Sequence, residues 1–408
     1  MLEPCQNIFS FNAGRDPERL QMKYGNMRRS AFVFLRGTCH LFYDRLSDAG
    51  TFPQSPLVWC CGDLHLENFG SYKGDNRLAY FDINDFDEAA LAPLSWDLVR
   101  FVTSVLVGAG SLGISKLEAR ALGSVFLASY KQVLSKGKSH WVERDTAQGL
   151  VGNLLDSLRQ RQRSAFLDRR TVLKGARRSL RIDGKKALSV TPGQREKVTT
   201  FFDEFASTQI NPQFFKVLDM ARRVAGTGSL GVERYIVLVH GKGGPNGNYL
   251  LDLKQALPSS LAPHLRNAQP KWKSEADRVV ALQRRIQAVS MAFLQPVTIG
   301  KRHYILRALQ PTEDRVTLDR SISSLQELEE VMQVMGDVVA SAHIRSSGRG
   351  GSAIADELIA FAAKKKWTDT IMGLARDCAK QVNTDWESYC KAFDQGFFRE
   401  REPAKFSA

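Results

Sequence analysis

The sequence predicts an α+β protein with two or more lobes, in which a β-rich part lies between helical parts. A chain of 408 residues with 43% hydrophobic and 25% charged residues can bury a large core, as a globular protein does. Apolar residues recur at helical spacing through much of the first half and through most of residues 311–408. Residues 226–256 instead show short strand patterns separated by glycine-containing turns.

These periodicities place the elements in chain order. A hairpin turn is expected at Gly74–Asn76, and a second turn, at 241–248, joins two strands of the β-rich part. Strand patterns cover residues 56–65, 76–85, 232–239, 248–256 and 302–310. Helical patterns cover residues 27–49, 96–134, 189–207, 211–226, 274–294 and most of 311–400, with a break at 346–352.

Two short stretches concentrate oxygen ligands. "CGDLHLENFG" (61–70) and "YFDINDFDEA" (80–89) together hold six carboxylates, one His and two Asn. Asp and Asn are common in ordinary turns, but an acidic loop followed by a turn and a strand that ends in Asp is an uncommon tandem. Phosphoryl transfer needs a carboxylate for the attacking hydroxyl and hard oxygen ligands for Mg²⁺. Asp63 is the predicted base, and His65 is the predicted orienting histidine. The predicted metal ligands are Asn68, Asp85 and Asp82.

Two further residues near these stretches have less specific roles. Asp97 lies just inside a predicted helix, where it could cap that helix or hold the acidic loop through backbone N–H groups. We predict a structural role for it. Arg36 is expected to be an ordinary helix-surface residue, with a contact to phosphate as the alternative.

A glycine-rich loop and a strand lysine follow much later in the chain. "GTGSLG" (226–231) is not the dinucleotide-binding motif of a βαβ unit, because no strand precedes it and no helix follows it. Its position in an antiparallel hairpin is that of a kinase glycine-rich loop, and Lys254 lies where a lysine that holds phosphates is expected. By itself, Lys254 would be an exposed strand residue. Glu275 is the best acid by type to pair with it, and residues 302–310 would lead into a hinge that holds adenine. The predicted nucleotide-binding residues are Gly226, Gly228, Ser229, Gly231, Lys254 and Glu275.

The net charge of +14 favours anionic partners. The excess is concentrated at 158–186, within a basic segment of about 140–190. Phe166 is the only aromatic residue in 158–186, so a base-stacking platform is not indicated, and no nucleic-acid reading module is recognisable. A site for an anionic partner and a solvated basic helix face explain this segment equally well.

Targeting signals and cysteine usage favour a cytoplasmic location. No apolar run of 18 residues is present, so no membrane span is predicted. The first residues lack the charged start and apolar core of a signal peptide. The six cysteines have no CxxC spacing, which favours reduced thiols.

Several of these motifs together resemble those of known protein families. In this order, "FVFLRG", "CGDLHLENFG", "FDINDFDEA", "WDLVR", "GTGSLG" and "LLDLKQA" resemble the bacterial domain-of-unknown-function family 2252, from about residue 15 to the late 300s. That family usually has an acid after the strand lysine, where this chain has Gln255. The acidic stretches also resemble the loop and metal-binding Asp of aminoglycoside and choline phosphotransferases, although Cys61 replaces the leading His. The spacing in those enzymes favours Asp85 over Asp82 as the metal ligand.

The second resemblance implies a two-lobed protein-kinase-like fold, with a small antiparallel β lobe and a larger, mainly helical lobe. The glycine loop and lysine normally come before the catalytic loop in that fold, and here they come after it. The resemblance therefore implies a circular permutation, which a fold tolerates when its original termini are close together. The implied parts are the catalytic-loop part of the helical lobe (1–215), the nucleotide-binding β lobe (216–310), and a hinge with C-terminal helices that return to the large lobe (311–408).

The leading functional prediction is an ATP- and Mg²⁺-dependent phosphotransferase with a small-molecule or protein hydroxyl as the acceptor. Alternatives are nucleotidyl transfer from the same pocket and a non-catalytic kinase-like protein that binds nucleotide or anionic partners. A metal-dependent phosphoesterase is a weaker alternative. "DLH" (63–65) resembles the first motif of such enzymes, but their dinuclear sites need further histidines in contexts that this chain lacks.

Overall fold

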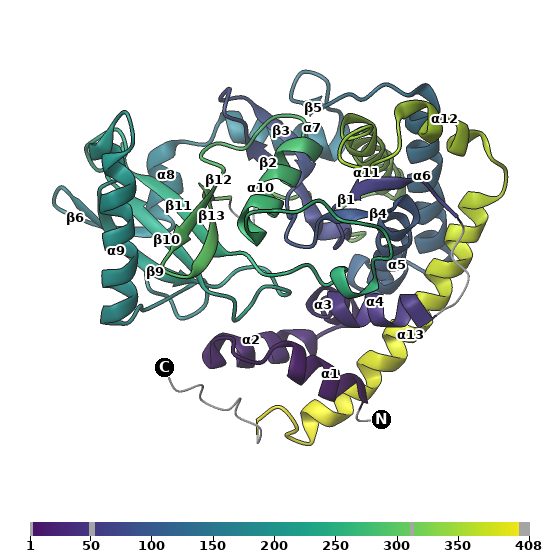
Figure 1. Cartoon of the computed structure of the whole chain (residues 1–408), viewed down its shortest axis with the longest axis horizontal. Coiled ribbons are helices and arrows are strands. Elements are labelled where there is room, and N and C mark those ends of the chain that lie inside the picture. The colour runs from purple at the N-terminus through teal and green to yellow at the C-terminus, as the bar shows by residue number, and fades with distance from the viewer. Residues whose placement is uncertain (1–2, 49–53, 311–313, 400–408) are drawn as a thin grey trace.

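The computed structural model describes residues 3–48, 54–310 and 314–399 as a large, mainly helical lobe beside a smaller lobe built on an antiparallel sheet (Figure 1). The predicted α+β class is confirmed. Within these ranges, no helix is both long enough and apolar enough to cross a bilayer. All six cysteines are free thiols, as predicted.

The large lobe is built around α5 (Leu94–Leu112), a helix that is apolar on almost every side and mostly buried. Helices α6 (Lys116–Lys136) and α13 (Trp367–Asp394) pack against α5, and α11 (Leu325–Arg345) packs along α6. Gly113 ends α5 in the left-handed conformation and so divides the helix predicted over 96–134. Further helices of this lobe are α3 (Ala31–Gly37), α4 (Cys39–Asp48), α7 (Gly149–Arg159), α10 (Glu275–Ile286) and α12 (Ala355–Ala363).

The small lobe is a six-stranded antiparallel sheet in the order β12–β13–β11–β10–β9–β8. One face packs on α9 (Pro192–Ser207), whose Phe202 lies in a separate apolar core with strand residues such as Val237. The strands are β8 (Ala187–Leu188), β9 (Val217–Arg223), β10 (Arg234–Val239), β11 (Tyr249–Gln255), β12 (Gln295–Ile299) and β13 (Arg302–Ala308).

The other face of this sheet is apolar in one half and charged in the other. Side chains alternate between the two faces, so Ile236 and Leu250 share this face with Arg234, Asp252 and Lys254. The apolar half is covered by α8 (Arg163–Asp168) and by the hairpin of β6 (Thr171–Lys174) and β7 (Arg177–Leu180). The charged half faces the large lobe.

Two loops of the large lobe lie side by side because of the strands that carry them. Residues 61–68, the Asp63 loop, connect β1 (Leu57–Cys60) to β2 (Phe69–Lys73) and end in a 3-10 turn (Leu66–Asn68). Residues 84–89, the acidic segment, connect β3 (Ala79–Ile83) to β4 (Ala90–Pro93). Cys60, just before the Asp63 loop, pairs with Ala90, just after the acidic segment. Phe69, just after the Asp63 loop, pairs with Ile83, just before the acidic segment, so the same two residue pairs flank both loops. Strand β5 (Val142–Glu143) extends the β2–β3 hairpin.

The N-terminal helices join the two lobes. Helix α1 (Glu3–Phe11) packs on α4 and α13, and α2 (Pro17–Met27) packs on α3. At the start of α2, the Asp16 carboxylate binds Arg222 of β9 at 2.7 Å, and the Asp16 N–H donates to the carbonyl of Gly231. The first helices therefore hold the small lobe against the large one.

Several predicted elements were wrong in type or extent. Residues 211–226 are not a helix: they form a 3-10 turn (Pro212–Phe215) and then β9, because pairing with β10 overrides the local helical period. The helix predicted over 27–49 is interrupted at Thr38, and position 49 lies outside the described residues. The helix predicted over 274–294 ends at Ile286.

The predicted domain boundaries also change. Helices α8 and α9 and strand β8 pack on or pair within the sheet, so the small lobe begins well before residue 216. The boundary at 311 falls outside the described residues.

Candidate active site

A cavity of about 1190 Å³ lies between the two lobes. The Asp63 loop and the acidic segment form one wall, and the glycine loop (226–231) and the charged half of the sheet form the other. Residues of α1, α4 and the segment 257–264 line one end. The predicted site residues that line the cavity are Asp63, His65, Asn68, Asp85, Gly226, Gly228, Ser229 and Gly231.

Asp63 is held by a buried arginine of α5. Nη2 and Nε of Arg100 donate to Oδ1 of Asp63 at 2.6 and 3.1 Å, and Oδ2 lies 3.9 Å from Nε2 of His65. Burial raises the pKa of Asp63, although the charge of Arg100 opposes the rise. Burial also holds the pKa of His65 well below its usual range, so this ring is neutral. Asp63 is therefore a carboxylate that Arg100 holds in a fixed orientation at the wall of the cavity.

Asp97 and a glycine set the shape of the Asp63 loop. The carboxylate of Asp97 accepts hydrogen bonds from the backbone N–H groups of Cys61 and Gly62, at 2.8 and 2.9 Å. The predicted structural role of Asp97 is confirmed. Gly62 has φ +85, and a Cβ there would lie 2.4 Å from the carbonyl oxygen of Glu88. Only glycine allows the loop and the acidic segment to approach this closely.

Asn68 and Asp85 offer oxygens that suit a hard cation. Nδ2 of Asn68 donates to the carbonyls of Asp63 and Asp85, at 3.1 and 3.3 Å, so its Oδ1 is the atom left without a partner among the described residues. The side chain of Asp85 is 49% exposed within the cavity. Burial opposes ionisation of Asp85, but the charges of Lys254 and Arg307 outweigh it and lower the pKa. A carboxylate and an amide oxygen on adjacent loops fit Mg²⁺.

Lys254 meets the acidic segment across the lobe boundary. It is only 2% exposed, its Nζ contacts Asp87 directly, and it lies 3.7 Å from Oδ1 of Asp85. Lys254 is thus not an exposed strand residue. The predicted pairing with Glu275 is wrong, because the acids of the acidic segment occupy Lys254. Glu275, in the first turn of α10, instead binds Nε of Arg278 at 2.5 Å. Arg278 in turn donates to the carbonyls of Asp87 and Ala89 and so supports the acidic segment.

The glycine loop is fastened to the N-terminal region. Gly226 and Gly231 have φ of +71 and +87, where glycine is strongly preferred. The carbonyl of Gly228 accepts hydrogen bonds from Arg15 and Lys23, each at 3.0 Å. Ser229 donates through its hydroxyl to the carbonyl of Ala225 within the loop. The loop therefore closes one side of the cavity in a fixed conformation.

Asp82 does not belong to the cavity, so its prediction as a metal ligand is wrong. It points to the other side of β3 and accepts hydrogen bonds from the N–H groups of Ile83 and Ala288, at 2.8 and 2.9 Å. Burial raises its pKa. Asp82 instead ties β3 to the segment that follows α10.

A comparison with protein families found a match that covers most of the chain. The model of a family described as an uncharacterized protein conserved in bacteria (DUF2252) matches residues 15–392. The chain belongs to this family. No curated protein and no solved structure matched it. The family predicted from the motifs is confirmed, and the match spans both lobes of this DUF2252 protein.

The most important residues that sequence reasoning missed in this DUF2252 member are arginines. Arg36 is not a helix-surface residue: its side chain is 10% exposed, lines the cavity and binds Glu67 at 2.6 Å. No role was predicted for Arg100, although it is the last residue of the quoted motif "WDLVR". Arg234 and Arg307 also line the cavity. The signal available in the sequence was an arginine within an otherwise apolar helix or strand. Such a position is expected to be buried, and a buried arginine almost always has a partner.

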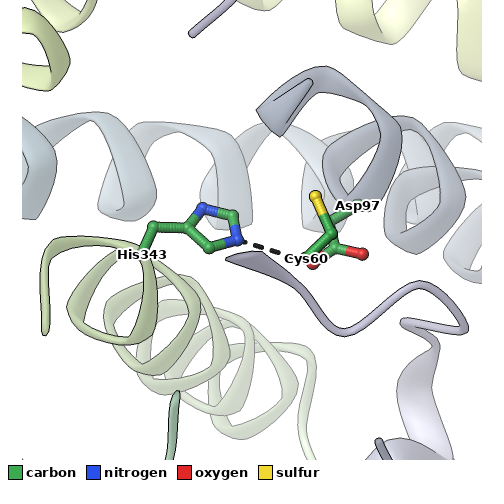
Figure 2. A group of neighbouring side chains, drawn as sticks. All are labelled: Cys60, Asp97 and His343. Atoms are coloured by element: carbon green, nitrogen blue, oxygen red, sulfur yellow. Dashed lines mark hydrogen bonds and ion pairs between the residues drawn. The ribbon is translucent and has the colours of Figure 1, made fainter. Parts of the chain in front are cut away.

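A second polar group lies beneath the Asp63 loop. Figure 2 shows His343 of α11 directed at Asp97, with Cys60 beside it; their ligand atoms lie within 4.8 Å of one another. Nε2 of His343 is 3.4 Å from Asp97, its Nδ1 is 2.9 Å from the hydroxyl of Tyr130, and the thiol of Cys60 donates to the carbonyl of Ala92. Each group already has a protein partner, so the cluster is a hydrogen-bonded support for the Asp63 loop.

Proposed function

We propose that this protein is an ATP- and Mg²⁺-dependent phosphotransferase with a kinase-like site whose parts follow one another in permuted order. The observation that carries the proposal is the contact between its two predicted halves. Lys254 lies 3.7 Å from Asp85, although the lysine and the glycine loop follow Asp85 in the chain. A base, two hard oxygen ligands and a glycine loop at one cavity, with a buried lysine behind the acidic segment, are the parts that phosphoryl transfer needs.

Asp63 is the proposed base. Arg100 occupies one carboxylate oxygen and leaves the other for the acceptor hydroxyl. In the proposed reaction the acceptor oxygen attacks the γ-phosphorus, its proton passes to Asp63, and the bond between the γ-phosphorus and the bridging oxygen breaks, which releases ADP. The raised pKa of Asp63 suits a group that takes up a proton during turnover.

Asn68 and Asp85 are the residues that would hold Mg²⁺. A bound magnesium ion would neutralise charge on the phosphate oxygens. Lys254 orients Asp85 and supplies positive charge next to the phosphates, and the glycine loop offers backbone N–H groups at the facing wall.

The packing of the chain ends supports the permuted kinase-like arrangement. The ends of a circularly permuted chain lie where the parent chain was continuous, so they are expected to lie close together. Helix α1, the first described helix, packs against α13, the last. Strands β9, β10 and β11 supply the glycine loop and the lysine in the order expected of a kinase-like β lobe.

The test is Mg²⁺-dependent nucleotide binding, measured by calorimetry on the full chain. We expect Asp85→Ala and Lys254→Ala each to weaken Mg·ATP binding at least tenfold. Asp145→Ala is the matched control, because this aspartate is exposed and, among the described residues, forms its ion pair with the neighbouring Arg144. If the native chain shows no Mg²⁺-dependent nucleotide binding, the proposal fails.

Labelled nucleotide separates the alternatives. Incubation with γ-labelled ATP and a panel of hydroxyl acceptors should label an acceptor and release ADP, and Asp63→Asn should abolish that labelling. Labelling from α-labelled ATP instead would identify nucleotidyl transfer. Binding without turnover on any acceptor would favour a non-catalytic nucleotide-binding protein.

A further inference from the structure

We infer that the charged half of the sheet is a polyphosphate site in which three arginines, Arg223, Arg234 and Arg307, hold the phosphate chain. The ligand class is a chain of linked phosphates, found in a nucleoside triphosphate and in inorganic tripolyphosphate. Its identity as a nucleotide rests on the proposed function. In this arrangement the guanidinium groups contact the phosphates, and Lys254 mainly holds the acidic segment.

Three strands bring these arginines to one carboxylate. Asp252 of β11 is fully buried and lies 2.9 Å from Arg223, 2.6 Å from Arg234 and 3.4 Å from Arg307. The register explains the convergence, since Arg307 pairs directly with Asp252 and Arg234 pairs with Lys254, two positions away on the same face. All three arginine side chains are at most 10% exposed and line the cavity.

The cluster has more positive charge than its own acids balance. Three guanidinium groups share one carboxylate, whereas Lys254 is balanced by Asp85 and Asp87. Uncompensated charge is costly in a buried position unless a counter-charge arrives. Burial lowers the pKa of Arg223 to about 10 even though Asp252 opposes the shift, and the charge of Arg234 adds to it. Nη1 of Arg223 also makes no hydrogen bond of good geometry to any described residue.

The three guanidinium groups connect the cavity walls on which a phosphate chain would lie. Arg234 reaches the carbonyl of Ala225 at the start of the glycine loop, at 3.4 Å. Arg307 reaches the carbonyl of Asn84 in the acidic segment, also at 3.4 Å. Arg223 donates to the carbonyl of Gln310 at 2.7 Å. An anion on this cluster therefore lies between the glycine loop and the acidic segment that carries Asp85.

A second arginine pair adds to the positive excess on the facing side. Arg36 and Arg315 both bind one oxygen of Glu67, at 2.6 and 2.9 Å, and both line the cavity. Together with the Asp252 cluster, Lys254 and its two aspartates, the formal excess is two positive charges, and a magnesium ion would add two more. A nucleoside triphosphate carries about four negative charges near neutral pH. The combined charge of these three groups and a magnesium ion thus matches that of a triphosphate better than that of a monophosphate.

The test compares ligands that differ in the length of the phosphate chain. Calorimetric titration of the full chain with ATP, ADP, AMP and tripolyphosphate should give affinities that rise with the number of phosphates, and tripolyphosphate should displace ATP. Arg234→Gln should weaken binding of ATP and of tripolyphosphate by a similar factor, about tenfold to a hundredfold, and AMP binding far less. Arg195→Gln, which removes a half-exposed arginine bound to Asp219 of the same lobe, is the matched control.

The outcomes separate this inference from the proposed function. Equal losses for ATP and AMP, no loss in Arg234→Gln, or failure of tripolyphosphate to compete would each overturn the inference, and Mg²⁺-dependent ATP binding would then still support the phosphotransferase. Binding of tripolyphosphate without any nucleotide binding would overturn the proposed function and support the polyphosphate site. If circular dichroism shows that Arg234→Gln is unfolded, Arg307→Gln replaces it, because Asp252 then keeps its two closer arginines.

Discussion

The ion pair between Arg100 and Asp63 allows a quantitative test of how the candidate base is held. Arg100 is fully buried, donates twice to Asp63 and once to the carbonyl of Leu35 at 2.8 Å, and stacks over Phe42. Removing one member of a buried pair costs about 3–5 kcal/mol, mainly because the other charge is left uncompensated. The carboxylate of Asp63 is 21% exposed, so we expect Arg100→Met to lower the free energy of unfolding by about 3 kcal/mol, at the low end of that range.

A double-mutant cycle measured by urea denaturation at neutral pH is the assay. Asp63→Asn in the Arg100→Met background removes the uncompensated charge, so the double variant should recover about 2 kcal/mol relative to additive losses. Arg144→Met, at an exposed pair with Asp145, should leave the midpoint unchanged. A loss below about 1 kcal/mol in Arg100→Met, or strictly additive losses in the double variant, would refute the reasoning.

Three further predictions concern other parts of the structure. Burial raises the pKa of Glu88 from 4.5 to about 7, so between these pH values the folded state holds a proton that the unfolded state releases. The free energy of unfolding should therefore be highest below about pH 4.5 and fall as the pH rises to 7, and Glu88→Gln should flatten this decline in urea titrations at several pH values. Gly231→Ala should cost about 1–3 kcal/mol in thermal unfolding, because its φ is +87 and its Cβ would lie 2.8 Å from that of Arg15, and an unchanged midpoint would show that the loop can move. Lys174→Glu with Arg177→Glu, at the exposed hairpin, should elute from heparin at lower salt while nucleotide binding is unchanged; equal elution would leave the basic segment as a solvated face.

The acidic half of the candidate site was predictable from the sequence because its spacing is local. Asp63, Asn68 and Asp85 lie on two loops next to short strands, and turn and strand signals located both loops. Asp82 was not separable from Asp85 in the same way. The two acids are close in sequence, but Asp82 is still within β3 and hydrogen-bonds to Ala288, whereas Asp85 lies beyond the strand end in the acidic segment and reaches the cavity.

Long-range partners could not be predicted from local patterns. Residue type favoured Glu275 as the acid for Lys254, but the acids that meet Lys254 come from the segment after β3. Similarly, the helical period of residues 211–226 was weaker than the pairing of β9 with β10. Both errors have the same origin, since the deciding contacts join parts of the chain that are far apart in sequence.

The sequence by itself determined the family, the α+β class and the positions of the acidic loops, the glycine loop and the strand lysine. These features depend on motif spacing and on local backbone preferences, which a short window of residues carries. Only the tertiary structure decided that Lys254 reaches Asp85, that Asp252 collects three arginines, and that Arg36 and Arg100 turn inward. The reason is physical: burial and the charge of neighbouring groups are set by strand register and lobe packing, and a single sequence does not contain these distances.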